Sequence, residues 1–204
     1  MAGILTVQTI QGPTSGANAN KVIIPAGQTL SVTDGVQASD MPAGSVLQVI
    51  NSIENSAVVS TSSSFAFVSG LVVNITPLSA TSKILVNVSL NNLSSVSGHF
   101  ALARLVRDST PLAVHSSSGG TTTNNSAFLA GGGGGDSNGS FSTDNRKISS
   151  GTLSYLDAPA TTSQLTYKVE FATSNTPNTV YINRWALDIN LGSSSSITVM
   201  EIAQ

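Results

Sequence analysis

The segment with the clearest chemical pattern is Gly135-Asp136-Ser137-Asn138-Gly139, which matches the G-x-S-x-G motif of serine hydrolases. That motif works when a strand precedes it, a helix follows it and a histidine base comes later in the chain. Here the flanking residues are glycine and serine, and both histidines of the chain come earlier. We therefore predict that Ser137 is not a catalytic nucleophile.

The same glycine run, residues 131–135 followed by Asp136, also matches the opening of a calcium-binding nonapeptide repeat. Asn138 stands where such a repeat has a large apolar residue, and only one copy is present. These sites need stacked repeats, because a calcium ion takes 6 to 8 oxygen ligands. We expect no cofactor or metal ion here, with adventitious calcium at Asp136 as the alternative.

Other catalytic groups are sparse. The least implausible acid pair for glycoside hydrolysis, Asp157 and Asp188, lies in turn-like settings that favour hydrogen bonds to the backbone. His99 and His115 bracket a predicted strand and turn, with no metal-binding spacing around them. Each is expected to be an ordinary polar residue, unless a threefold assembly brings three copies of one histidine to an axis. The chain is predicted not to be an enzyme.

Aromatic and amide side chains are the better candidates for binding. Trp185, the only tryptophan, follows Arg184 and is expected to be a core or interface residue; the alternative is a platform on which a sugar ring stacks. A Gly/Ser-rich loop at residues 115–146 carries further candidates, because loops on rigid scaffolds often bind ligands. The proposed contacts are Asn124, Phe128, Asn138, Phe141 and Trp185.

Composition narrows the remaining classes of function. Charged residues make up 9% of the chain and the formal net charge is −2, with eight Lys plus Arg, so a nucleic-acid partner is not expected. No apolar run approaches the roughly 18 residues of a membrane helix, and the first residues do not form a secretory signal, so no membrane insertion is expected. There is no cysteine, which excludes disulfides and thiol chemistry.

The elements that must position these residues are strands. In residues 83–91 and 165–171, apolar and polar side chains alternate with period two, which is typical of a strand with one buried face. Less regular strands are expected at residues 45–51, 57–61, 65–68, 71–76, 100–107, 152–156, 180–183 and 197–203. Short strands separated by Pro, Gly and Asn indicate an antiparallel β-sandwich, similar to a jelly roll.

The first 44 residues differ from the rest. Their short apolar runs are separated by Gly, Pro and Asn and are too small to bury their own apolar faces. We therefore predict an N-terminal β stalk at residues 1–44, which borrows its core from sister chains in a homotrimer, and a head domain at residues 45–204. A flexible tail is the alternative for the first segment.

Five segments resemble the tail-fibre and virion-appendage proteins of marine podoviruses and related phages. They are IPAGQTL (residues 24–30), MPAGSVLQVI (41–50), ITPLSATSKILV (75–86), YLDAPATTSQLTYKV (155–169) and SITVMEIA (196–203). The last segment and the TSKILV part of the third are the most specific.

This resemblance implies a trimeric appendage with a β-sandwich head and variable loops. Its N-terminal part would attach to other virion proteins. The expected location is therefore the virion, assembled in the host cytoplasm. The expected role is that of a fibre or spike subunit that contributes to recognition of a glycan or protein on the host surface. The alternative is a capsid cement protein or tail adaptor that binds only other virion components.

Overall fold

The computed structural model describes residues 12–17, 19, 21–29, 41–95, 100–114, 129–131, 148–174 and 176–204. The chain divides into two compact units, residues 1–37 and 38–204. In the described ranges of the first unit there are turns and bends but no strand. Val22, Ile23 and Ile24 in this unit are 55%, 56% and 42% exposed, so its apolar run is not buried within one chain.

The second unit is built from strands, and its described residues contain no helix. The all-β prediction is therefore confirmed. The strands are β1 (Val46–Glu54), β2 (Val58–Ser60), β3 (Ala66–Ile75), β4 (Lys83–Ser95), β5 (Ala101–Arg107), β6 (Thr110–Leu112), β7 (Leu129–Gly131), β8 (Ser149–Asp157), β9 (Leu165–Thr173), β10 (Val180–Ile182), β11 (Arg184–Trp185), β12 (Asp188–Gly192) and β13 (Ser195–Ile202). In the described ranges, no helix has the length and apolarity that a bilayer crossing demands.

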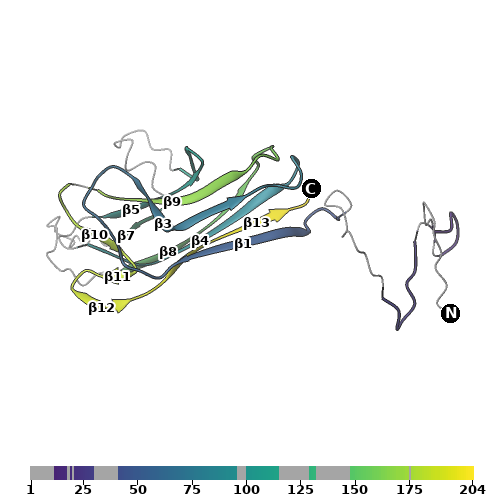
Figure 1. Ribbon diagram of the computed structural model, residues 1–204, viewed down its shortest axis with the longest axis horizontal. Helices are drawn as coiled ribbons and strands as arrows, with labels where there is room; N and C mark the ends of the chain where they lie inside the picture. Colours follow the sequence, from purple (N-terminus) through teal and green to yellow (C-terminus); the bar gives the residue numbers. More distant parts are fainter. Residues whose placement is uncertain are drawn as a thin grey trace, which may run out of the picture. The chain divides into compact units, whose positions relative to one another are not determined.

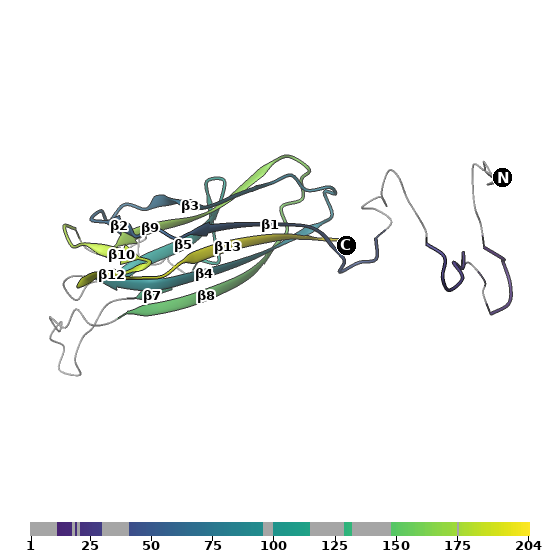
Figure 2. The same cartoon turned by 60° about the horizontal axis from the view of Figure 1, so that its bottom comes forward.

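The strands form two antiparallel sheets that face each other (Figures 1 and 2). The first sheet has the order β1-β13-β4-β8, and the second has β3-β9-β5, followed by β6 and β7 on the far edge of β5. Successive long strands alternate between the sheets, and across the core β1 faces β3, β13 faces β9 and β4 faces β5. This is the strand order of a double-sheet jelly roll, as the sequence predicted.

At two positions in the strand order of the first sheet, two shorter strands follow one another end to end. We call each position in this strand order a line of the sheet. Both β10 and β13 pair with β4, β10 at Ser94 and Ser95 and β13 further along at residues 83–89, so they continue one another along the same edge of β4. In the same way, β1 pairs with β13 and β2 pairs with β10. The hairpin of β11 and β12 fills the gap between β10 and β13.

The two ends of this sandwich differ. We call the end where β1 begins and β13 stops the base, and the opposite end, with β10, β11 and β12, the distal end (Figure 1). At the base, the Gly44 amide donates to the Ala203 carbonyl over 2.8 Å and the Ala203 amide donates to the Ser45 carbonyl over 2.9 Å. Gly44, which the sequence assigned to the stalk, is thus hydrogen-bonded to the head.

The core lies between the sheets and follows the predicted alternation. Ile84, Val86 and Val88 from β4 are at most 2% exposed, and Tyr167 and Val169 from β9 are fully buried against them. Their polar neighbours in sequence point outward, as a period of two requires. On β9, Glu170 accepts from Arg104 Nε over 2.8 Å, and the Arg104 guanidinium lies 4.1 Å from the centre of the Phe65 ring.

One edge of the sandwich is closed by side chains of β1 and β3. Residues 68–71 bulge from β3 between its pairs Phe67–Glu170 and Val72–Lys168, so the two strands expected at residues 65–68 and 71–76 are one bulged strand. At this bulge, the Gly70 amide donates to Glu54 Oε2 over 3.2 Å, and Ser52 Oγ donates to the Gly70 carbonyl over 2.8 Å. The sequence analysis missed four short strands, which have two to five residues each: β6, β7, β11 and β12.

Candidate functional site

Of the five predicted contact residues, the structure describes only Trp185. Asn124, Phe128, Asn138 and Phe141 lie outside the described residues, as do the glycine-rich motif and both histidines. Strand β7, which is part of the predicted loop, pairs with residues 101–103 at the distal half of β5. Trp185 is half-buried in β11, also at the distal end.

The distal hairpin is a short excursion from the first sheet. Trp185 pairs with Asp188 across a two-residue turn, whereas Arg184 pairs with Gly192, so residues 189–191 bulge outward between the two pairs. Within the bulge, the amide of Asn190 donates to Asp188 Oδ1 over 2.8 Å. This hydrogen bond of a side chain to the backbone two residues on stabilises the turn, as was predicted for Asp188.

Asn183 fixes the root of this hairpin. It is 2% exposed and has a positive φ of 62°, a conformation that asparagine adopts more readily than most residues. Its side-chain Nδ2 donates to the carbonyls of Glu54 over 2.6 Å and Ser56 over 3.2 Å. Its Oδ1 accepts from Ser195 Oγ over 2.6 Å. The Ser195 Oγ in turn accepts from the amide of Asn91 over 3.0 Å.

Arg184 holds the first strand of the hairpin against the sheet. Its guanidinium lies 4.6 Å from the centre of the Tyr181 ring, close enough for a cation–π interaction, and its carbonyl accepts from Ser94 Oγ over 2.7 Å. With Asn183, these contacts join the hairpin to three lines of the first sheet, β1/β2, β10 and β4. The hairpin therefore projects from the sheet but is held in place by these contacts.

Three aliphatic side chains of this projection face solvent. Leu187, Ile189 and Leu191 are 52%, 72% and 51% exposed. They recur with a period of two in the sequence, a signal that the sequence analysis did not use. Exposed apolar groups that cluster on a rigid element often mark interaction surfaces. The distal hairpin is thus a candidate contact site, and it includes Trp185, which pairs with Asp188 next to the turn.

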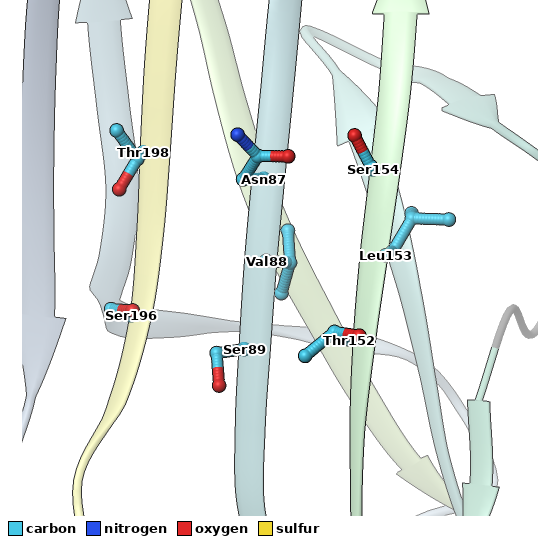
Figure 3. Close-up of a pocket in the computed structure, with 8 residues that line it drawn as sticks. All are labelled: Asn87, Val88, Ser89, Thr152, Leu153, Ser154, Ser196 and Thr198. Atoms are coloured by element: carbon cyan, nitrogen blue, oxygen red, sulfur yellow. The ribbon is translucent and has the colours of Figure 1, made fainter.

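A shallow groove lies on the outer face of the first sheet. It has a volume of about 270 Å³ and crosses β13, β4 and β8 (Figure 3). Six of its eight lining residues carry a hydroxyl or amide, and none is titratable; they are Asn87, Val88, Ser89, Thr152, Leu153, Ser154, Ser196 and Thr198. Such a surface hydrogen-bonds water or a polyhydroxyl ligand, but it has no group to activate a nucleophile or transfer a proton.

The least implausible acid pair of the sequence is not a pair in the structure. Asp157 lies at the base, where its Oδ2 accepts from Arg107 over 2.6 Å and from the Tyr167 hydroxyl over 2.7 Å, while Asp188 lies in the distal hairpin. Burial, together with the hydrogen bond to Asp157, raises the pKa of Tyr167 well above its usual range. The group of Asp157, Arg107 and Tyr167 ties the two sheets together.

The remaining described carboxylates also accept hydrogen bonds from the protein. Glu201, fully buried on β13, accepts from the amide of Leu78 over 2.8 Å and from Gln48 Nε2 over 2.6 Å. Asp108 Oδ1 accepts from the amide of Thr166 over 2.9 Å. Within the described ranges, no group of three or more His, Asp or Glu side chains is placed to hold a metal ion. These acids are therefore engaged in holding the fold.

Comparison with protein-family models gives no match for this chain. Comparison with curated protein sequences gives no match either.

Proposed function

We propose that this chain is a non-enzymatic structural subunit of a phage particle, a fibre or spike protein that works as a homotrimer and contacts the host surface with its distal end. The observation that carries the proposal is that the two ends of the head differ. The chain enters at the base through residues 41–45, whereas the opposite end presents a supported hairpin with three exposed aliphatic side chains. A subunit that is attached at one end and binds at the other needs this arrangement.

Two further observations support this function. The apolar run at Val22, Ile23 and Ile24 is exposed in a single chain, which favours an N-terminal segment that is covered by sister chains. Each described carboxylate is engaged by a protein donor, which favours a binding role over general acid–base catalysis. Jelly rolls occur in viral capsid proteins and in lectins, although the fold alone does not assign a function.

A blocking experiment tests the adhesive role. Purified full-length protein is incubated with host cells before the particle is added, and adsorption of the particle is measured. We expect the wild-type protein to reduce adsorption and Ile189→Asp to lose this effect, because a charge replaces a side chain that is 72% exposed on the hairpin. Val59→Asp is the matched control, since Val59 is 58% exposed and lies outside the hairpin. Equal blocking by Ile189→Asp and wild type would exclude the hairpin as the contact.

A capsid cement or tail-adaptor protein is the second candidate. It is favoured by apolar side chains on the outer face of the first sheet, such as Val49 and Leu156, which are 55% and 52% exposed. Antibodies raised against the purified chain separate the two functions in electron micrographs of intact particles. Labelling at the tips of appendages supports the fibre, whereas labelling over the capsid or the tail junction, with no binding of the protein to cells, supports the second candidate.

A further inference from the structure

The outer face of the first sheet is apolar at its base end, whereas the next rows toward the distal end are mainly polar, with the exposed Ile53 among them. Cross-strand pairing places Val49 beside Met200, Met200 beside Leu85 and Leu85 beside Leu156, so these four side chains form one row across all four lines of the sheet. Val46 and Ile202 form a second pair next to it, nearer the base. We call these six side chains the apolar row. The groove of Figure 3 begins in the next row toward the distal end, at Thr198, Asn87 and Ser154.

The apolar row is exposed in the single chain. Val46, Val49 and Leu156 are 51%, 55% and 52% exposed, and the other three side chains are half-buried. The outward positions of an antiparallel sandwich are usually polar, because that face meets water. A row of six apolar side chains at outward positions is instead typical of a face that another protein surface covers.

Its charge and position favour another copy of the same chain as the occupant. Lys83, paired with Ile202, is the one charged side chain among the outward positions of the paired β1, β13, β4 and β8 residues. Such a face meets an identical face with little like-charge repulsion and offers little to an oppositely charged partner. Residues 41–45 lead directly into Val46, the first residue of the row.

The connection of each head to the N-terminal segment raises the effective concentration at which the apolar row of one head meets that of another head. If residues upstream of 38 join three chains, as in the function proposed above, the base ends of three heads are tethered to one another through short connections. The row spans three interstrand spacings, about 14 Å. Its two rows of side chains lie about 7 Å apart along the strands, so it covers on the order of 100 Å², far less than the roughly 800 Å² per partner of a standard stable interface. Association through the row therefore depends on the tether.

We propose that, in the homotrimer inferred above, the apolar row packs against the same sheet face of sister chains and forms the contact between heads. The distal hairpins and the β3-β9-β5 sheet then stay outside this contact. This inference rests on the homotrimer of the proposed function, and it adds which face of each head forms the contact.

Charge substitutions in full-length protein test the assignment. Val49→Glu and Leu156→Glu each place a carboxylate in the row, and Val59→Glu is a matched control with the same change at a side chain of similar exposure, 58% against 55% for Val49. Light scattering after size-exclusion chromatography should give three times the 20.7 kDa chain mass for wild type and Val59→Glu. For the two row variants we expect dissociation at concentrations at least tenfold higher than for the control, with circular dichroism unchanged.

Thiol accessibility gives a second measurement, made first on the intact assembly and then on the assembly weakened by Val49→Glu. The chain has no cysteine, so Leu156→Cys and Val59→Cys each introduce a single thiol. We expect the thiol at 156 to react with a maleimide reagent at least tenfold more slowly than the thiol at 59, and the difference to disappear when Val49→Glu is added.

The outcomes separate the inference from the proposed function. A trimeric wild type whose row variants remain trimers, with a rapidly labelled thiol at 156, overturns the assignment of this face and leaves the trimeric fibre in place. A monomeric wild type at micromolar concentration overturns both the trimer and the contact between heads.

Discussion

Replacing Asn183 tests whether buried hydrogen bonds at the root of the hairpin hold the distal end of the sandwich. Asn183→Ala removes two donations to the carbonyls of Glu54 and Ser56 and one acceptance from Ser195. Each buried polar group that loses its partner costs about 1–3 kcal/mol, although water reaches part of this edge. Alanine at a φ of 62° adds about 1 kcal/mol. We expect the free energy of unfolding to fall by about 3–5 kcal/mol.

Urea unfolding followed by circular dichroism and by the fluorescence of Trp185 measures this change. Trp185 is the only tryptophan and lies two residues from the substitution, so disagreement between the two probes would reveal local opening of the hairpin. For a unit of this size, the expected loss lowers the melting temperature by roughly 6–20 °C. A loss below about 1 kcal/mol for Asn183→Ala would refute the role assigned to this network.

Two further variants divide the effect into its parts. Asn183→Gly removes the same side chain but tolerates the positive φ, so it should be about 1 kcal/mol less destabilising than Asn183→Ala. Asn190→Ala is the matched control, because Asn190 is exposed and its side chain bonds only within the hairpin, to Asp188. Its effect should stay within about 0.5 kcal/mol of wild type.

Three other substitutions have defined expectations. Tyr167→Phe removes the buried hydrogen bond to Asp157 and should lower the free energy of unfolding by about 1–2 kcal/mol at pH 7. Because the pKa of Tyr167 is raised in the folded state, the unfolded chain binds fewer protons than the folded chain above about pH 10, and the stability of the wild type falls there. The phenylalanine variant should lose this part of the pH dependence. Denaturant titrations at pH 8–11 would measure the difference. Glu201→Ala removes the acceptor of three part-buried donors and should cost about 2–4 kcal/mol in the same urea assay. In Gly70→Ala, the new Cβ would lie 2.5 Å from Glu54 Oε2, so the Glu54 side chain must move and the melting temperature should fall by several degrees.

Each of these expectations has its own control or contradicting outcome. An alkaline loss of stability that persists unchanged in Tyr167→Phe would assign that loss to other groups. Glu201→Gln keeps one acceptor oxygen and should be milder than Glu201→Ala; equal effects would argue against hydrogen bonding as the cause. Gly192→Ala is the control for Gly70→Ala, because its new Cβ would meet only an ordinary contact at 3.5 Å from the Asn183 carbonyl. Similar melting temperatures for the two alanine variants would contradict the steric argument.

The candidate site was only partly predictable. Trp185 was singled out by its chemistry, and it lies in the distal hairpin, next to the turn. The exposed Leu187, Ile189 and Leu191 alternate in the sequence, but alternation alone does not reveal whether the apolar face is covered. The same holds for the apolar row: that Val49 lies beside Met200 and Leu156 beside Leu85 became visible only with the register of four paired strands.

The sequence by itself determined the local strand character of this protein. The alternation in β4 and β9 is a property of neighbouring residues, so it predicted both strands and their buried faces without knowledge of their partners. Tertiary structure alone decided that β10 and β13 are one interrupted line and that Asn183 closes the interruption. The physical reason is that the Asn183 side chain donates a hydrogen bond to the Glu54 carbonyl, 129 residues away, and no local pattern encodes a partner at that separation.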